Sequence, residues 1–190
     1  MSLRPLGASR GASSPSEPSP PRDRPSAFVA ALRRLARRDH SSHELETALL
    51  RRGYPQDEIE GALERLSSEG LLNDLKFAES TATRRIGRDR LGRHRVRQEL
   101  FRRGVDPKTL EDGLARALTE VSEAEALEGA ARKYWASHAR VPAESRVRRL
   151  HAFLVRRGYP SPAVRACIRK LWPRLEDAFA GSDPEEEMEA

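Results

Sequence analysis

Apolar residues recur at spacings of three and four from about Ser26 to Ala180, and no run of β-branched residues interrupts them. This spacing places apolar side chains on one face of an α-helix, whereas a half-buried strand alternates apolar and polar residues with a period of two. The pattern therefore predicts an all-α fold.

One stretch of the pattern occurs three times, and each copy contains the tripeptide Arg-Arg-Gly. The copies read LLRRGYPQDEIEGAL from Leu49, LFRRGVDPKTLEDGL from Leu100 and LVRRGYPSPAVRACI from Leu154. The glycine falls where a left-handed residue ends a helix without a Cβ penalty, and the arginine pair favours the negative end of the helix dipole. Each copy therefore predicts a helix, a turn at its glycine, and a second helix.

Apolar residues align across the three copies at positions that follow the apolar stripe of a helix, and we expect them to be buried. They lie two and one residues before the first arginine, and six and ten residues after the glycine: Leu49, Leu100 and Leu154; Leu50, Phe101 and Val155; Ile59, Leu110 and Val164; Leu63, Leu114 and Ile168. Units of this size stack because one unit alone cannot bury its apolar face. The repeat therefore predicts tandem three-helix repeats that form an elongated, curved array.

The repeat and the composition of the two ends divide the chain into segments. Residues 1–25 hold six prolines and six serines with few apolar side chains, which is typical of a disordered arm. We expect a lead helix over 26–40, three-helix repeats over 41–90 and 91–140, a shortened repeat over 141–180, and a loose acidic tail over 181–190. Local signals mark helix starts: Ser41 with Glu44 as a capping box, and Asn73 or Asp74, Asp106 and Ser122.

Composition narrows the class of protein. A net charge of +6 favours an anionic partner, and the absence of any apolar run near roughly 18 residues predicts a soluble, cytoplasmic protein with no membrane span. The single cysteine, Cys167, excludes an intramolecular disulfide, and we expect it at a buried helix position. His40 and His43 lie three apart without a third ligand, and no phosphate-binding loop occurs. We therefore expect no enzyme, no metal and no cofactor.

The stretch from Arg84 to Arg103 has the highest charge density of the chain. It contains nine arginines and two acidic residues, which give a local net charge of +7. Val96 and Leu100 define the buried side of the helix after Gly92, so its arginines at 95 and 102 lie opposite. The candidate contacts to a partner or to phosphates are Arg84, Arg85, Arg88, Arg95, Arg102 and Arg103.

One run of residues holds Leu72, Asn73, Asp74, Phe77 and Ala78, and a second run holds Gly92, Val96, Glu99 and Leu100. These two runs resemble the RecX family, the regulators of the RecA recombinase. The resemblance covers roughly residues 27–172. It implies an all-helical protein of tandem three-helix repeats that lies in the groove of the RecA nucleoprotein filament and inhibits strand exchange and ATP turnover. From the charge pattern we expect the arginine-rich stretch to contact RecA subunits together with DNA phosphates. We expect such a protein to act as a monomer.

A helix-turn-helix protein that binds duplex DNA directly is the alternative, because each copy has a short turn with glycine. The second helices begin QDEIE, KTLED and PAVRA, and the first two are acidic, which disfavours base reading. A further hypothesis concerns the acidic tail, whose carboxylates would compete with DNA for the arginine-rich stretch.

Overall fold

The computed structural model describes residues 24–173, and all regular structure within this range is helical, as predicted. The predicted acidic tail and all but the last two residues of the predicted arm lie outside the described residues. The elements are α1 (Ala27–Leu35), α2 (Ser42–Leu50), α3 (Gln56–Ser68), α4 (Asp74–Thr83), the π-helical turn η1 (Arg84–Arg88), α5 (Arg93–Arg102), α6 (Pro107–Glu120), α7 (Glu123–Ser137), α8 (Ala143–Arg156) and α9 (Ser161–Leu171).

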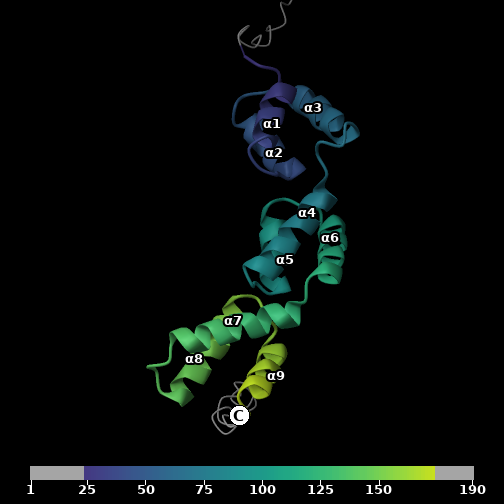
Figure 1. Ribbon diagram of the computed structural model, residues 1–190. Coiled ribbons are helices and arrows are strands. Elements are labelled where there is room, and N and C mark those ends of the chain that lie inside the picture. The colour runs from purple at the N-terminus through teal and green to yellow at the C-terminus, as the bar shows by residue number, and fades with distance from the viewer. Residues whose placement is uncertain (1–23, 174–190) are drawn as a thin grey trace, which may run out of the picture.

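Three hydrophobic cores divide these helices into three modules that follow one another along an elongated molecule (Figure 1). The first module contains α1 to α3, the second contains α4 to α6 with η1, and the third contains α7 to α9. This grouping differs by one helix from the segments expected at 41–90, 91–140 and 141–180. The helix α1 belongs to the first core, and α4 and α7 pack with the helix pairs that follow them.

The predicted helix starts are present. Ser41 accepts a bond from the backbone N–H of Glu44, and the Glu44 side chain accepts from the backbone N–H of Ser41, so the capping box is complete. The side chains of Asn73, Asp106 and Ser122 cap α4, α6 and α7. The caps at Asn73 and Ser122 begin the first helix of the second and third modules, which explains where one module ends and the next begins.

The three glycine turns have the predicted left-handed backbone. The φ angles are 75° at Gly53, 74° at Gly104 and 92° at Gly158. The helices α2, α5 and α8 end at Leu50, Arg102 and Arg156, within three residues of these glycines. The tripeptide therefore lies at the C-terminal end of the middle helix of each module.

Burial confirms most of the predicted apolar stripe but not all of it. The side chains two residues before the first arginine, Leu49, Leu100 and Leu154, are completely buried. The next residue in each copy is not: Leu50, Phe101 and Val155 are 47%, 64% and 40% exposed, so the prediction of their burial was wrong. A helix turns by about 100° per residue, and no other helix of the described chain covers the side to which the second apolar residue points.

Candidate partner-binding surface

The middle helices of the three modules form a row in which the C-terminal turn of one helix meets the N-terminal turn of another. The glycine turn after α5 lies against the start of α2, and the glycine turn after α8 lies against the start of α5. Figure 1 shows α2, α5 and α8 on one side of the molecule and α3, α6 and α9 on the other. We call α2, α5 and α8 the helix row. Its helices place a negative dipole end against a positive one at each contact.

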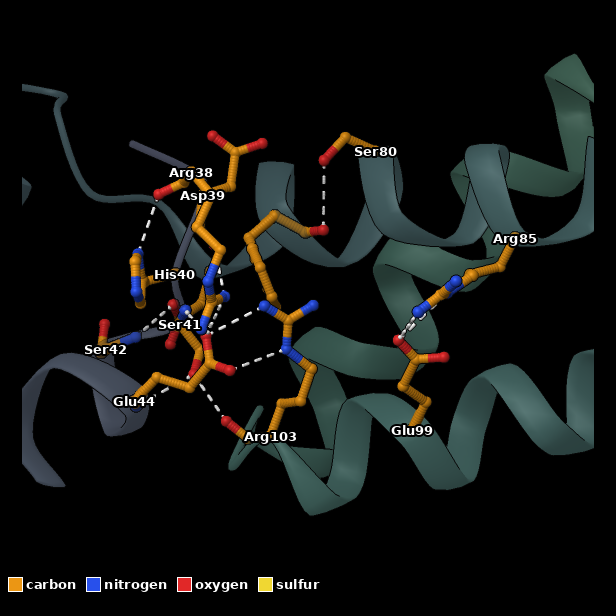
Figure 2. A network of polar contacts seen from close by, with 12 residues as sticks. Arg38, Asp39, His40, Ser41, Ser42, Glu44, Ser80, Arg85, Glu99 and Arg103 are labelled. Atoms are coloured by element: carbon orange, nitrogen blue, oxygen red, sulfur yellow. Dashed lines mark hydrogen bonds and ion pairs between the residues drawn. The ribbon is translucent and has the colours of Figure 1, made fainter. Parts of the chain in front are cut away.

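The first contact in the row joins the first and second modules. The Ser41 hydroxyl donates a hydrogen bond of 2.5 Å to the backbone oxygen of Arg103. The Arg103 guanidinium donates to both carboxylate oxygens of Glu44 at 3.0 Å (Figure 2). It also lies over the ring of Phe77. The side chains of Arg103 and Glu44 are mostly buried, so this ion pair is shielded from solvent.

The charge of Glu44 is fixed by this contact. Burial raises the pKa of the carboxyl group, but hydrogen bonds and charge from Arg103 and Arg38 outweigh it and lower the pKa from 4.5 to about 2. The carboxylate therefore stays ionised at any physiological pH and holds Arg103 in place.

The second contact joins the second and third modules. As in the first contact, the residue before one helix donates a hydrogen bond to the backbone oxygen of the second arginine of an Arg-Arg pair, but here the donor is a backbone N–H. The N–H of Gly92 donates to the backbone oxygen of Arg157 at 2.9 Å. The Arg157 guanidinium donates to the backbone oxygens of Asp89 and Arg90. A Cβ atom on Gly92 would lie 2.3 Å from the Gly158 oxygen, so the two backbones meet too closely for any side chain. The sequence indicated only that a helix follows Gly92, and the close approach of this glycine to another module was missed.

The two arginines of each Arg-Arg-Gly copy have different environments. In the second and third copies the second arginine, Arg103 or Arg157, builds the contact between modules. The first arginine of every copy is exposed and has no acidic partner among residues 24–173: these residues are Arg51, Arg102 and Arg156. The tripeptide therefore combines a structural arginine with a solvent-facing one.

The six arginines predicted as partner contacts also fall into a structural group and a solvent-facing group. Two are largely shielded from solvent and paired within the chain: Arg103 with Glu44, and Arg85 with Glu99 at 2.7 Å and with Asp89 at 2.8 Å. The other four are exposed and form no ion pair within the described part of the chain: Arg84, Arg88, Arg95 and Arg102.

These four arginines lie on two neighbouring elements of the second module. On η1 the buried residue is Ile86, so the arginines two positions before and after it lie on the opposite side. On α5 the buried residues are Val96 and Leu100, which directs Arg95 and Arg102 outward. The Arg85–Glu99 ion pair ties η1 to α5 (Figure 2). We call Arg84, Arg88, Arg95 and Arg102 the arginine surface.

The described chain contains a groove and a buried cysteine outside the arginine surface. A groove of about 640 Å³ between α4 and α6 is lined by both signs of charge, including Arg84, Arg116, Glu79 and Glu120. Cys167 is buried as expected, and burial raises the pKa of its thiol to about 11, which disfavours the reactive thiolate. Within residues 24–173 no three potential metal ligands are grouped, and no helix is long and apolar enough to cross a membrane.

The fold defines an elongated protein of tandem helical modules. Residues 27–66 match the first three-helix domain of RecX, and residues 73–114 match the second. The chain is 31% identical over 146 residues to the regulatory protein RecX of Chlorobium phaeobacteroides, covering 77% of this chain and 93% of that protein. It is 40% identical over 128 residues to the regulatory protein RecX of Pseudomonas syringae pv. tomato, covering 66% and 79%. The chain belongs to the RecX family of regulatory proteins.

A solved structure agrees on the fold. The crystal structure of RecX from Lactobacillus salivarius superposes with a TM-score of 0.67 at 21% identity, covering 76% of this chain and 94% of that chain. At this identity the comparison supports the arrangement of the helices alone. The tandem three-helix architecture predicted from the repeat is confirmed.

Proposed function

We propose that this chain regulates a RecA recombinase by lying along the RecA–DNA filament, where it lowers strand exchange and ATP turnover. The family to which the chain belongs supports a regulatory role, and an elongated row of helices suits an extended partner. The observation that carries the proposal is the arginine surface, which places four positive charges without ion-pair partners among the described residues on the middle module.

The proposed contact is electrostatic and non-catalytic. Guanidinium groups bind phosphates and carboxylates in a bidentate geometry, so the arginine surface can engage DNA phosphates and acidic residues of RecA. The helices on either side then extend the contact to neighbouring subunits of the filament. In this proposal a cytoplasmic monomer changes ATP turnover only through its partner.

Direct reading of duplex DNA is less well supported. A recognition helix presents base-reading side chains at its N-terminus, but the first turn of α3 holds Asp57 and Glu58. In α6 the Lys108 amine is paired with Asp112. Carboxylates at these positions repel phosphates, so we do not assign α3 or α6 to a DNA groove.

We expect the purified chain to lower ATP turnover by RecA on single-stranded DNA. The reason is that a protein bound along the filament limits the subunit exchange or motion that turnover requires. The measurement is the steady-state rate of phosphate release as the chain is titrated into preformed filaments. An unchanged rate at saturating chain would refute the proposal.

Charge reversal of the arginine surface should weaken this inhibition. In a variant with Arg84→Glu, Arg88→Glu, Arg95→Glu and Arg102→Glu, we expect the half-inhibitory concentration to rise about tenfold, because attraction to phosphates becomes repulsion. The logarithm of the binding constant for bare duplex DNA should fall with the logarithm of salt concentration with a slope of about −3 to −4 for the unaltered chain, and the variant should show a flatter line.

A control on the first module reverses two exposed charges, half as many as the test variant: Arg33→Glu and Arg37→Glu, which form no ion pair within residues 24–173. This control measures the effect of lowering the net charge outside the arginine surface. Its half-inhibitory concentration should differ from that of the unaltered chain by less than twofold. Equal loss of inhibition in both variants would show that net charge matters and that the arginine surface is not a specific site.

A further inference from the structure

The helix row exposes an apolar side chain at the same place in each module. Leu50, Phe101 and Val155 each occupy the residue before the Arg-Arg pair, in the last turn of α2, α5 and α8. Soluble proteins expose isolated apolar residues often, but three exposures at one repeated position form a pattern rather than scatter. Phe101 is the most exposed large apolar residue of the described chain.

A solvent-facing arginine follows each of these apolar residues. Arg51, Arg102 and Arg156 are exposed and have no acidic partner among the described residues. The next arginine is used differently, because Arg103 and Arg157 bind groups of the neighbouring module. Each module therefore presents the same pair, an apolar side chain and an exposed guanidinium.

The row sets the spacing of these pairs. The end of α8 meets the start of α5, and the end of α5 meets the start of α2. The distance between successive pairs is therefore about the length of one short helix. A helix of ten residues, such as α5, spans roughly 15 Å. The three pairs thus recur at nearly regular intervals along the helix row.

We propose that the helix row docks on a protein that repeats one apolar pocket with an acidic rim, as successive subunits of a filament do. Leu50, Phe101 and Val155 fill the pockets, and Arg51, Arg102 and Arg156 pair with the carboxylates on their rims. Phenylalanine and arginine are enriched at protein interfaces, and arginine is frequent among the residues that dominate the binding energy, so Phe101 and Arg102 should contribute most to the contact. This inference rests on the proposed function, because it names the contact that the chain makes with RecA subunits.

The apolar residues favour a protein partner over nucleic acid at the row. Bases of a single strand stack on aromatic rings, and Phe101 with its neighbouring arginine offers such a platform. The equivalent residues in the other two modules are Leu50 and Val155, which have no π face. A partner that recognises all three modules in the same way must therefore accept aliphatic side chains, as an apolar pocket does.

The test compares inhibition of RecA ATP turnover by four proteins: the unaltered chain, F101S, the triple variant L50S/F101S/V155S, and L71S. Leu71 is a matched control, since it is 48% exposed and lies in the turn between α3 and α4, outside the row. We expect the half-inhibitory concentration to rise about tenfold for F101S and at least about thirtyfold for the triple variant. We expect a change of less than twofold for L71S.

Each outcome decides a different claim. If the unaltered chain inhibits and the triple variant inhibits equally well, the docking row is refuted while the proposed function stands. If the unaltered chain has no effect on turnover, the proposed function falls and this inference falls with it. Thermal unfolding followed by circular dichroism checks the fold, and if the triple variant is destabilised, F101S alone decides.

Binding to a bare single-stranded oligonucleotide, measured by fluorescence anisotropy, separates the two kinds of partner. We expect F101S and the unaltered chain to bind the oligonucleotide with affinities within twofold of each other, because the pocket belongs to a protein. A loss of oligonucleotide affinity that equals the loss of inhibition would overturn the inference and assign Phe101 to base stacking.

Discussion

Replacing Gly158 by valine is expected to detach the third module from the second and to lower the free energy of unfolding by about 3–4 kcal/mol. Gly158 has a φ of 92°, which a β-branched residue adopts only with strain. Its Cβ atom would also lie 2.5 Å from both the backbone nitrogen and the Cβ atom of Arg95. The turn must then move away from α5, which breaks the bonds that Gly92 and Arg157 make across the contact.

Thermal unfolding and small-angle X-ray scattering measure the two parts of this effect. We expect the melting temperature to fall by roughly 10 °C and the radius of gyration to increase as the third module becomes free to move. The matched control is Gly70→Val, because Gly70 has a φ of 71° but a Cβ atom added there would meet no other part of the described chain within 4 Å. It isolates backbone strain, so its cost should be about 1–2 kcal/mol with unchanged scattering. Equal effects of the two substitutions would contradict a close contact between modules at Gly158.

Replacing Glu44 by glutamine is expected to lower the free energy of unfolding by about 2–3 kcal/mol at pH 7. Glutamine keeps the size of the side chain and an oxygen for the capping bond to Ser41. It removes the negative charge that holds Arg103 and Arg38, so a mostly buried guanidinium loses its ionic partner. Urea unfolding measures the loss, with Glu64→Gln as the control, since the exposed Glu64 forms no ion pair within the described chain and should change stability by less than about 0.5 kcal/mol.

The loss of stability caused by Glu44→Gln should depend on pH. The pKa of Glu44 is lowered from 4.5 to about 2 in the folded chain, so the stabilisation is fully present above pH 4.5 and is lost as the pH falls through about 2. The difference in unfolding free energy between the unaltered chain and Glu44→Gln should therefore be constant from pH 7 to pH 5 and shrink below pH 4.5. A difference that does not change between pH 7 and pH 2.5 would contradict an ionic role for Glu44.

Local features of the chain were predictable because short segments determine them. The capping box at Ser41 and Glu44 and the left-handed turns at Gly53, Gly104 and Gly158 need only neighbouring residues, and all of them are present. The buried leucines of the Arg-Arg-Gly copies were predictable for the same reason, since the helical period places them on the core side.

The contacts between modules were not predictable, because they join residues that are distant in the sequence. Arg103 and Glu44 are 59 residues apart, and Arg157 bonds to a backbone oxygen 68 residues away. An arginine that forms such a contact has the same neighbours in the sequence as one that faces solvent. The charge pattern therefore grouped Arg85 and Arg103 with the exposed arginines, although both are paired within the chain.

The exposed residues of the row illustrate a second limit. Leu50, Phe101 and Val155 are apolar and follow fully buried leucines, so the sequence alone predicts that they are buried as well. One side of a helix is buried only where another element packs against it. In this chain the buried sides of α2, α5 and α8 face the hydrophobic cores of their own modules. The repeated exposure becomes visible only when the three modules are compared in the structure.

An electron cryo-microscopy reconstruction of RecA on single-stranded DNA with this chain bound would show whether the helix row and the arginine surface face the filament. We expect density for three helical modules along the filament, with α2, α5 and α8 against RecA subunits and Arg84, Arg88, Arg95 and Arg102 toward phosphates or acidic side chains. A bound chain whose helix row faces solvent, with α3, α6 and α9 against the filament, would contradict this expectation.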